Sequence, residues 1–142
     1  MVEHSYQALM KAIVNKLRGG GVWGNQVSEV IQPAWVKPYC LVYFISGGET
    51  NNLIAQDADY EIGVKVIADN QQQSLTGAAQ VLELLNDKGE QDTSTSPLDG
   101  GTDWTITTST AGRMIHLIEP FQNAQNIYHD GHVFSFVLGR TS

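Results

Sequence analysis

The chain of 142 residues is short of several residue types, and each shortage excludes a class of protein. It has one cysteine, Cys40, so an intrachain disulfide is impossible, and a lone thiol inside an apolar run suits a reducing cytosol. Only 8 lysines and arginines stand against 15 acidic residues, which gives a net charge of −7. Nonspecific DNA binding depends on basic residues that neutralise phosphates, so direct nucleic-acid binding is not expected.

Long apolar runs are lacking too. No run approaches the roughly 20 residues that span a bilayer, so no membrane segment is expected. The first five residues have no basic region leading into an apolar core, so we expect no signal peptide. Charged residues make up 16% of the chain, below the usual figure of about 25%. The remaining polar surface repels itself only weakly, which suits a protein that packs against copies of itself.

Apolar residues recur at helical spacing in two segments. We predict one helix from about His4 to Arg18, and a second from about Asn70 or Ser74 to Lys88 with Asp69 or Asn70 as its N-cap. The glycines at 19–21 end the first helix; a phosphate cradle would need them to precede a helix. The expected buried stripes are Tyr6, Leu9, Met10, Ile13 and Leu17, and then Leu75, Ala78, Val81, Leu82 and Leu85.

A dry strand and an amphipathic strand lie between the two helices. The segment Pro38–Ile45 is apolar at successive positions and predicts a central strand, and the polar segment Ser46–Asn52 is expected to be a connector. Strict alternation over Asp59–Ile67 predicts a half-buried antiparallel strand. Its apolar face is Tyr60, Ile62, Val64 and Val66, and its polar face holds Asp59, Glu61 and Lys65.

The rest of the chain is read as loops and three short strands. Val22–Lys37 is predicted to be irregular or a short strand, and the polar segment Gly89–Gly101 a mobile loop. The three strands are Asp103–Ser109, Arg113–Glu119 and His132–Leu138, with Gly112 and Asp130-Gly131 as turns. The fold class that results is α+β. We expect one domain over residues 1–142, with a mostly antiparallel or mixed sheet of four to five strands and two main helices packed on it.

Three groups of residues could carry chemistry, and each has a plainer interpretation. His129-Asp130-Gly131-His132 could contribute to a zinc site, but zinc needs three or four ligands and the other histidines are far away in sequence, so a turn is favoured. The acidic row of Asp57, Asp59 and Glu61 is favoured as a solvated face or a charged subunit contact over a catalytic pair, because a general acid needs a pocket that raises its pKa. Cys40 is expected to fill the core. We therefore predict no catalytic, cofactor-binding or metal-binding residue.

The candidate residues for contact with partners are aromatic and polar. Trp23 and Trp35 flank the irregular segment before the dry strand, and indole is favoured at interfaces. The alternative is that they form a core lid over the first helix. The other candidates for a subunit or tube interface are Glu49, Asn51, Asn52, Asp59, Glu61 and Lys65.

This order of elements resembles the tail-completion or tail-terminator proteins of long-tailed bacteriophages, from about Ser5 to Leu138. The long loop Gly89–Gly101 and the connector Phe121–Tyr128 depart from that pattern and are candidate docking elements. The parts that match are the helix Tyr6–Leu17, the Pro38-Tyr39 start of the dry strand, the connector Gly47–Asn52, the strand Tyr60–Ile67, the helix Ser74–Leu85 and the closing strand Phe134–Leu138.

The resemblance implies a structural role in a virion. Proteins of this family assemble as a hexameric ring on the end of the tail tube, stop its polymerisation and present a surface to the head connector or stopper protein. DNA would pass through the ring without specific binding, and no reaction, metal or cofactor is implied. The expected location is the head-proximal end of the virion tail, and the host cytoplasm during assembly.

Other functions remain open at this stage. A head–tail joining protein or another minor tail protein would share most of these features. A small α+β enzyme or ligand-binding module, with a pocket between the second helix and the sheet, is a different class, as is a regulatory or toxin-system binding domain. Mass under native conditions separates the ring from the enzyme.

Overall fold

The computed structural model describes residues 3–51, 56–86, 97–120 and 125–141. These residues form two helices and one five-stranded mixed sheet, which confirms the predicted α+β class. The strand order is β1-β2-β3-β5-β4; β1 is parallel to β2 and the other pairs are antiparallel. The elements are α1 (Ser5–Leu17), β1 (Val27–Ser28), β2 (Tyr39–Asn51), β3 (Gln56–Ala68), α2 (Gln71–Leu85), β4 (Trp104–Pro120) and β5 (Asn126–Arg140).

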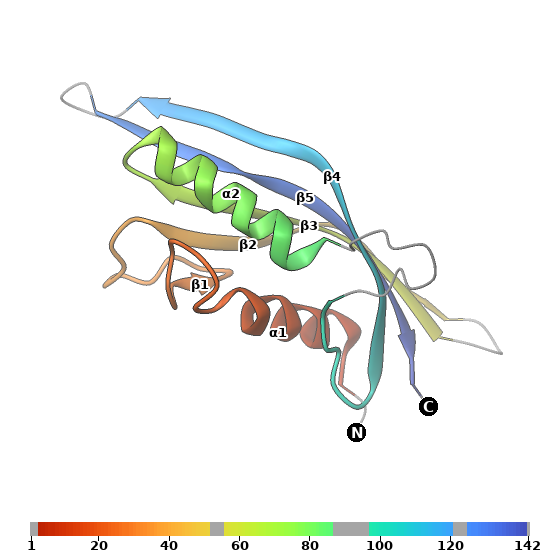
Figure 1. Ribbon diagram of the computed structural model, residues 1–142. Helices are drawn as coiled ribbons and strands as arrows, with labels where there is room; N and C mark the ends of the chain where they lie inside the picture. The colour runs from red at the N-terminus through yellow and green to blue at the C-terminus, as the bar shows by residue number, and fades with distance from the viewer. Residues whose placement is uncertain (1–2, 52–55, 87–96, 121–124, 142) are drawn as a thin grey trace.

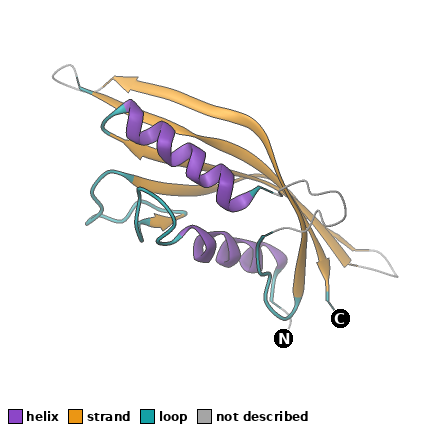
Figure 2. Cartoon of the chain, in the orientation of Figure 1, coloured by secondary structure: helices purple, strands orange, loops and turns teal. Residues whose placement is uncertain are grey.

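Both helices lie on one face of the sheet, as Figures 1 and 2 show. We call this the helix face and the opposite one the open face, because no described helix covers it. Alternation along β3 decides which side chains go where. Ala58, Tyr60, Ile62, Val64 and Val66 are all less than 5% exposed on the helix face, as predicted for that strand.

Helix α1 follows its predicted stripe closely. Leu9, Ile13 and Leu17 are fully buried, and Tyr6 packs at the margin of the core. The helix begins one residue later than predicted because His4 is the N-cap, where its Nδ1 accepts from the Tyr6 amide at 3.1 Å. Glycine follows the helix at Gly19, which has the left-handed φ of 72° that glycine tolerates best.

The buried face of helix α2 differs from the predicted stripe in the first turn of the helix. Asn70 is the N-cap, as predicted, and its side chain accepts from the Gln73 amide at 2.8 Å. Leu75 was expected in the core but is 39% exposed. The reason is Gly77, where a Cβ would lie 2.7 Å from the Val66 side chain, so the helix approaches β3 along its small residues and Leu75 faces outward.

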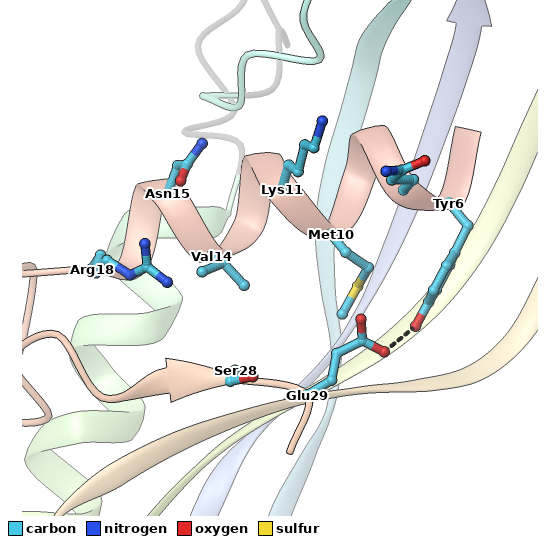
Figure 3. A pocket seen from close by; sticks show the side chains of 9 residues that line it. Tyr6, Met10, Lys11, Val14, Asn15, Arg18, Ser28 and Glu29 are labelled. Carbon is cyan, nitrogen blue, oxygen red and sulfur yellow. Dashed lines mark hydrogen bonds between the residues drawn. The ribbon is translucent and has the colours of Figure 1, made fainter. Parts of the chain in front are cut away.

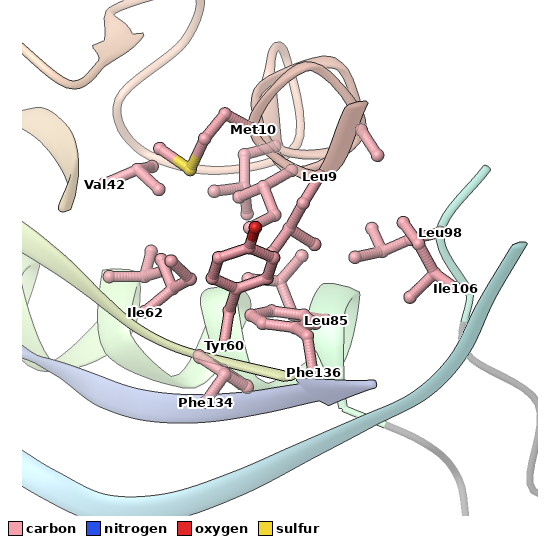
Figure 4. Close-up of a cluster of buried hydrophobic side chains, with 14 of the residues drawn as sticks. Leu9, Met10, Val42, Tyr60, Ile62, Leu85, Leu98, Ile106, Phe134 and Phe136 are labelled. Carbon is pink, nitrogen blue, oxygen red and sulfur yellow. The ribbon is translucent and has the colours of Figure 1, made fainter. Parts of the chain in front are cut away.

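The core lies between the two helices and the helix face, and Figure 4 shows its centre. Phe134 and Phe136 of β5 stack with ring centroids 6.0 Å apart. Leu98, inside the segment predicted to be a polar loop, is 7% exposed and packs in this core. The part of that loop over residues 87–96 lies outside the described residues, so its predicted mobility stays a prediction.

The predicted connector Ser46–Asn52 is wrong, because β2 continues through it to Asn51. A bulge between Phe44 and Ser46 shifts the register by one residue, and pairing with β3 then resumes from Ser46↔Glu61 to Asn51↔Gln56. The two consecutive glycines, Gly47 and Gly48, therefore lie in a paired strand here and not in a turn.

The two predicted strands before and after Gly112 are a single strand, β4, so the predicted turn there is wrong. It keeps β5 as its partner throughout, with register shifts between Ile106 and Thr108 and between Ala111 and Met114. The second irregularity contains Gly112 and Arg113. A bulge and a turn favour the same residue types, which is why the sequence could not separate them.

Asp130-Gly131 was also predicted to be a turn, and this too is wrong because both residues lie inside β5. Asp130 is fully buried on the helix face. A Cβ on Gly131 would lie 1.9 Å from the Val64 carbonyl oxygen, so glycine is required there for the close approach of β5 to β3.

Candidate interface surfaces

The acidic row lies on the open face, where the alternation of β3 placed it. Asp57 and Asp59 are exposed and Glu61 is half-buried. The Ser46 hydroxyl donates to Glu61 at 3.4 Å, across the pair that follows the β2 bulge. A shallow groove of about 350 Å³ runs beside Asp59 and Glu61 toward Val137 of β5. This end of the open face therefore presents carboxylates to solvent from a rigid strand.

Lys65 continues the same face but stands in different surroundings. The Tyr43 ring lies over Gly63, where a Cβ would be 2.2 Å from it, and the Lys65 ammonium is 5.6 Å from the ring centroid. Burial lowers the pKa of Lys65, and the nearby Glu119 carboxylate opposes that shift. The lysine is therefore part of a packed aromatic contact and is less available to a partner than the acidic row.

Glu49 connects the sheet to α1. Its carboxylate accepts from the Ser5 amide at 3.1 Å, from the Ser5 hydroxyl at 2.7 Å and from the Gln56 side chain at 2.9 Å. The Ser5 hydrogen bond is the main cause that lowers the pKa of Glu49, and burial opposes it. A predicted interface residue is thus occupied by contacts within the chain.

An aromatic pocket of about 380 Å³ opens beside Glu49. Tyr6 lies 5.6 Å from both Phe44 and Tyr60 between ring centroids, and Phe44 is 49% exposed. The pocket lies where β2 passes the start of α1. It is lined mainly by apolar atoms and lies on the helix face, because Phe44, Glu49 and Tyr60 point to that face in the register of β2 and β3.

A second groove, of about 470 Å³, runs between α1 and the segment around β1 (Figure 3). The Tyr6 hydroxyl donates to Glu29 at 2.9 Å at one end, and the Arg18 guanidinium lies at the other. Burial, with a further contribution from Glu29, raises the pKa of Tyr6 to about 12. The groove brings one carboxylate and one guanidinium to its ends, and its lining contains neither histidine nor cysteine.

The two tryptophans have different positions. Trp23 is 2% exposed and its indole N–H donates to the Leu17 carbonyl at 2.6 Å, so it is a core side chain over the first helix and offers no surface to a partner. Trp35 is half-buried, with its ring 5.7 Å from Tyr39. Asn51 ends β2, and Asn52 lies outside the described residues.

The two histidines considered for a zinc site lie on opposite faces of the sheet. His129 and His132 lie three positions apart on one strand, so they point to opposite faces. His129 Nε2 is 3.0 Å from Glu119, whereas Asp130 on the other face is hydrogen-bonded to Ser74 and His116. In the part of the chain that the structure describes, no three metal-ligating side chains come together.

Sequence reasoning missed two features of these surfaces. The Ser74–Asp130–His116 network, in which Ser74 and Asp130 are buried and His116 is exposed, joins α2, β5 and β4, and only the strand register brings these residues together. The other feature is the exposure of apolar side chains in the strands, such as Phe44 in β2 and Met114 and Leu117 in β4, which local periodicity cannot distinguish from core residues. A polar residue at a core position of the second helix, such as Ser74, was the one available hint of a buried hydrogen bond.

Comparison with known proteins shows a likeness of fold. No family model matches the chain, and no curated protein matches it. Among solved structures, it is similar to a chain from the structure titled "Virion of native gene transfer agent (GTA) particle", with a TM-score of 0.69 and 18% sequence identity. The likeness covers 95% of this chain and 97% of the other, so the two share a fold over nearly their whole lengths.

None of the helices within the described ranges is long and apolar enough to cross a lipid bilayer.

Proposed function

We propose that this chain is a structural protein of a virion, which forms a ring at the end of a tail tube, ends tube polymerisation and provides the surface that the head connector joins. The observation that carries the proposal is the likeness, over nearly the full length of both chains, to a chain of the gene transfer agent virion. The resemblance of the element order to tail terminators supports the finer assignment to the head-proximal end of the tail, with a hexamer as the expected ring.

The open face supports this role electrostatically. Asp57, Asp59 and Glu61 project from a strand whose opposite side is locked into the core. A ring with this face toward its lumen presents carboxylates to the DNA that passes through it. Like charge keeps the phosphates from adhering, so the DNA moves without specific binding.

Tube polymerisation tests the proposal. Purified chain is added to the tail-tube protein of the same virus as it polymerises, and tube lengths are measured by electron microscopy. We expect shorter tubes of narrower length distribution, with a ring on one end. Tubes of unchanged length would contradict termination, and a chain that binds finished tubes or the connector without limiting growth would point to a head–tail joining protein.

A control variant keeps the fold and alters only charge on the open face. Glu61→Gln removes one carboxylate of the acidic row and leaves the exposed Asp57 and Asp59, so we expect it to shorten tubes as the wild type does. A variant of the core, such as Phe134→Ala, is expected to lose the effect through unfolding, which circular dichroism would report separately.

A further inference from the structure

The aromatic pocket beside Glu49 is walled by three rings from three different elements. Tyr6 comes from α1, Phe44 from β2 and Tyr60 from β3. The ring centroid of Tyr6 is 5.6 Å from each of the other two, and those of Phe44 and Tyr60 are 6.4 Å apart. The angles between the ring planes are 81°, 58° and 69°, so the rings stand across one another and form the walls of a corner.

Gly47 keeps this corner open. On the helix face of β2 it stands between Phe44 and Glu49, and it pairs with Tyr60. Its φ is 121°, and a Cβ there would lie 2.1 Å from the Asp59 carbonyl oxygen, so glycine is required. Because this position has no side chain, the pocket of about 380 Å³ reaches Tyr60, which is only 4% exposed, while Phe44 at the rim is 49% exposed.

The two tyrosine hydroxyls are already used in hydrogen bonds within the chain. The Tyr6 hydroxyl donates to Glu29 at 2.9 Å (Figure 3). The Ser5 hydroxyl donates to Glu49 at 2.7 Å, so the Tyr60 hydroxyl, 2.6 Å from the Ser5 oxygen, is the donor of that pair. Each phenol therefore donates toward a carboxylate, Tyr6 directly and Tyr60 through Ser5. Such bonds enrich the rings in electron density, and an electron-rich ring face attracts cations.

The Glu49 carboxylate supplies negative charge to the pocket but few free acceptor sites. Its pKa is lowered mainly by the Ser5 hydrogen bond, so it is charged at neutral pH. Ser5 donates to it twice and Gln56 once, which leaves about one of roughly four lone-pair positions for a ligand. Among the described residues that line the pocket, His4 alone can carry a positive charge, and its side chain is 64% exposed.

We infer that this pocket binds an alkylammonium group, either a lysine side chain of another protein or a quaternary ammonium ion, against the faces of Tyr6, Phe44 and Tyr60. Aromatic faces that surround a site on several sides are the arrangement that recognises such cations. A guanidinium is planar and favours a bidentate carboxylate, and the oxygens of Glu49 are largely occupied by Ser5 and Gln56. The site is separate from the proposed role in a tail, and neither depends on the other.

NMR titration of the whole chain tests the inference. The first probes are choline, which carries a quaternary ammonium, and dimethylbutanol, its uncharged isostere with carbon in place of the nitrogen, both at constant ionic strength. We expect choline to bind with a roughly millimolar dissociation constant and to shift the backbone amide signals of Gly47, Gly48 and Glu49. The uncharged alcohol should bind at least about threefold more weakly, because it lacks the attraction between cation and ring.

Two blocked tripeptides distinguish the sources of the cation. Gly-Lys-Gly presents a lysine ammonium, and Gly-Arg-Gly presents a guanidinium in the same context. If the lysine peptide binds as tightly as choline, the ligand is a protein side chain, whereas binding of choline alone identifies a quaternary ammonium. In either case the arginine peptide should bind more weakly than the preferred probe, because the pocket lacks a free carboxylate edge.

Three variants separate the ring from the rest of the pocket. Phe44→Leu removes one ring at a half-exposed position, so the fold should tolerate it, and it should weaken choline binding about three- to tenfold. Phe44→Tyr keeps the ring and should bind choline within about twofold of the wild type. Trp35→Leu is the matched control, because it removes a ring from the separate pair of Trp35 and Tyr39, and it should bind choline as the wild type does.

Any of three results would overturn the inference. One is equal binding of choline and dimethylbutanol, which would show that the pocket responds to shape and not to charge. Another is a Phe44→Leu variant that is folded by circular dichroism and binds choline as tightly as the wild type. The last is no binding by either choline or the lysine peptide, or tighter binding by the arginine peptide than by both.

Discussion

The two faces of the sheet are made by the same strands but have different surroundings. On the helix face, Ile62, Val64 and Phe134 are fully buried beneath α1 and α2. On the open face, their neighbours Glu61 and Ser135 meet solvent, and Tyr43 and Lys65 pack only on the sheet itself. The helix face holds the fold together, and the open face is free to serve a partner or a lumen.

The difference between the two faces is tested most strongly by removing a large side chain from the helix face. Phe134→Ala should lower the free energy of unfolding by about 3–5 kcal/mol, because it leaves a cavity beside Phe136. Val137→Ala, on the open face of the same strand and 38% exposed, should cost less than about 1 kcal/mol. Chemical denaturation of both variants checks the prediction, and similar losses from the two would contradict it.

A smaller loss is expected where two strands approach each other closely. Gly131→Ala should destabilise the protein by about 1–3 kcal/mol or more, because the added methyl meets the Val64 carbonyl and the backbone cannot move freely. Gly48→Ala is the matched control, since a Cβ there has no atom within 4 Å. Thermal unfolding gives the melting temperatures of the two variants. Equal melting temperatures would refute the packing argument.

The link between the sheet and α1 gives a prediction that depends on pH. Glu49→Gln should lower the free energy of unfolding by about 1–2 kcal/mol at pH 7, because Ser5 loses a charged acceptor. The pKa of Glu49 is lower in the folded chain than its ordinary value of 4.5, so the charged carboxylate stabilises the fold above that value. This contribution is lost as the pH falls through the lower, folded pKa.

Denaturation at pH 7 and at pH 3 measures this effect. The difference in free energy of unfolding between Glu49→Gln and the wild type should be smaller at the lower pH. Glu61→Gln, on the open face, is the control and should show a small gap at both values. A gap for Glu49→Gln that stays constant with pH would show that its charge is not what holds α1.

The smallest effect on stability is expected from the acidic row itself. Replacing Asp57, Asp59 and Glu61 together by lysine should change the free energy of unfolding by only about 0.5 kcal/mol for each exposed position. The assembled variant should bind duplex DNA at low salt and release it as salt rises, whereas the wild type should not bind. Electrophoretic mobility of DNA with each protein measures this, and equal binding by both would argue against an acidic lumen.

Sequence periodicity predicted those parts of the fold in which burial follows directly from spacing. The stripe of α1 and the alternation of β3 were confirmed because 3.6 and 2 residues per repeat are properties of the local backbone, whatever lies beyond it. The Asn70 cap was confirmed for the same reason, since a side chain that accepts from an amide three residues on needs only local geometry. The α+β class followed from the order of these elements.

The candidate site was predicted less completely. The acidic row was placed correctly on one face, but Glu49 is held by Ser5, and Trp23 is in the core. The exposure of Phe44 in β2 and of Met114 in β4 could not be predicted, because an apolar residue in a strand has the same local pattern whether a neighbouring element covers it or not.

What the sequence determined by itself was therefore the identity of each face: which side chains of a helix or strand point the same way, and that the chain is acidic and lacks basic stripes. Tertiary structure alone decided what each face meets. Gly47, Gly112 and Gly131 have the turn-like signal of glycine, but they lie inside strands, because bulges and close strand contacts demand the same small residue. A glycine reports a constraint on the backbone, and only the neighbouring strand shows which constraint it is.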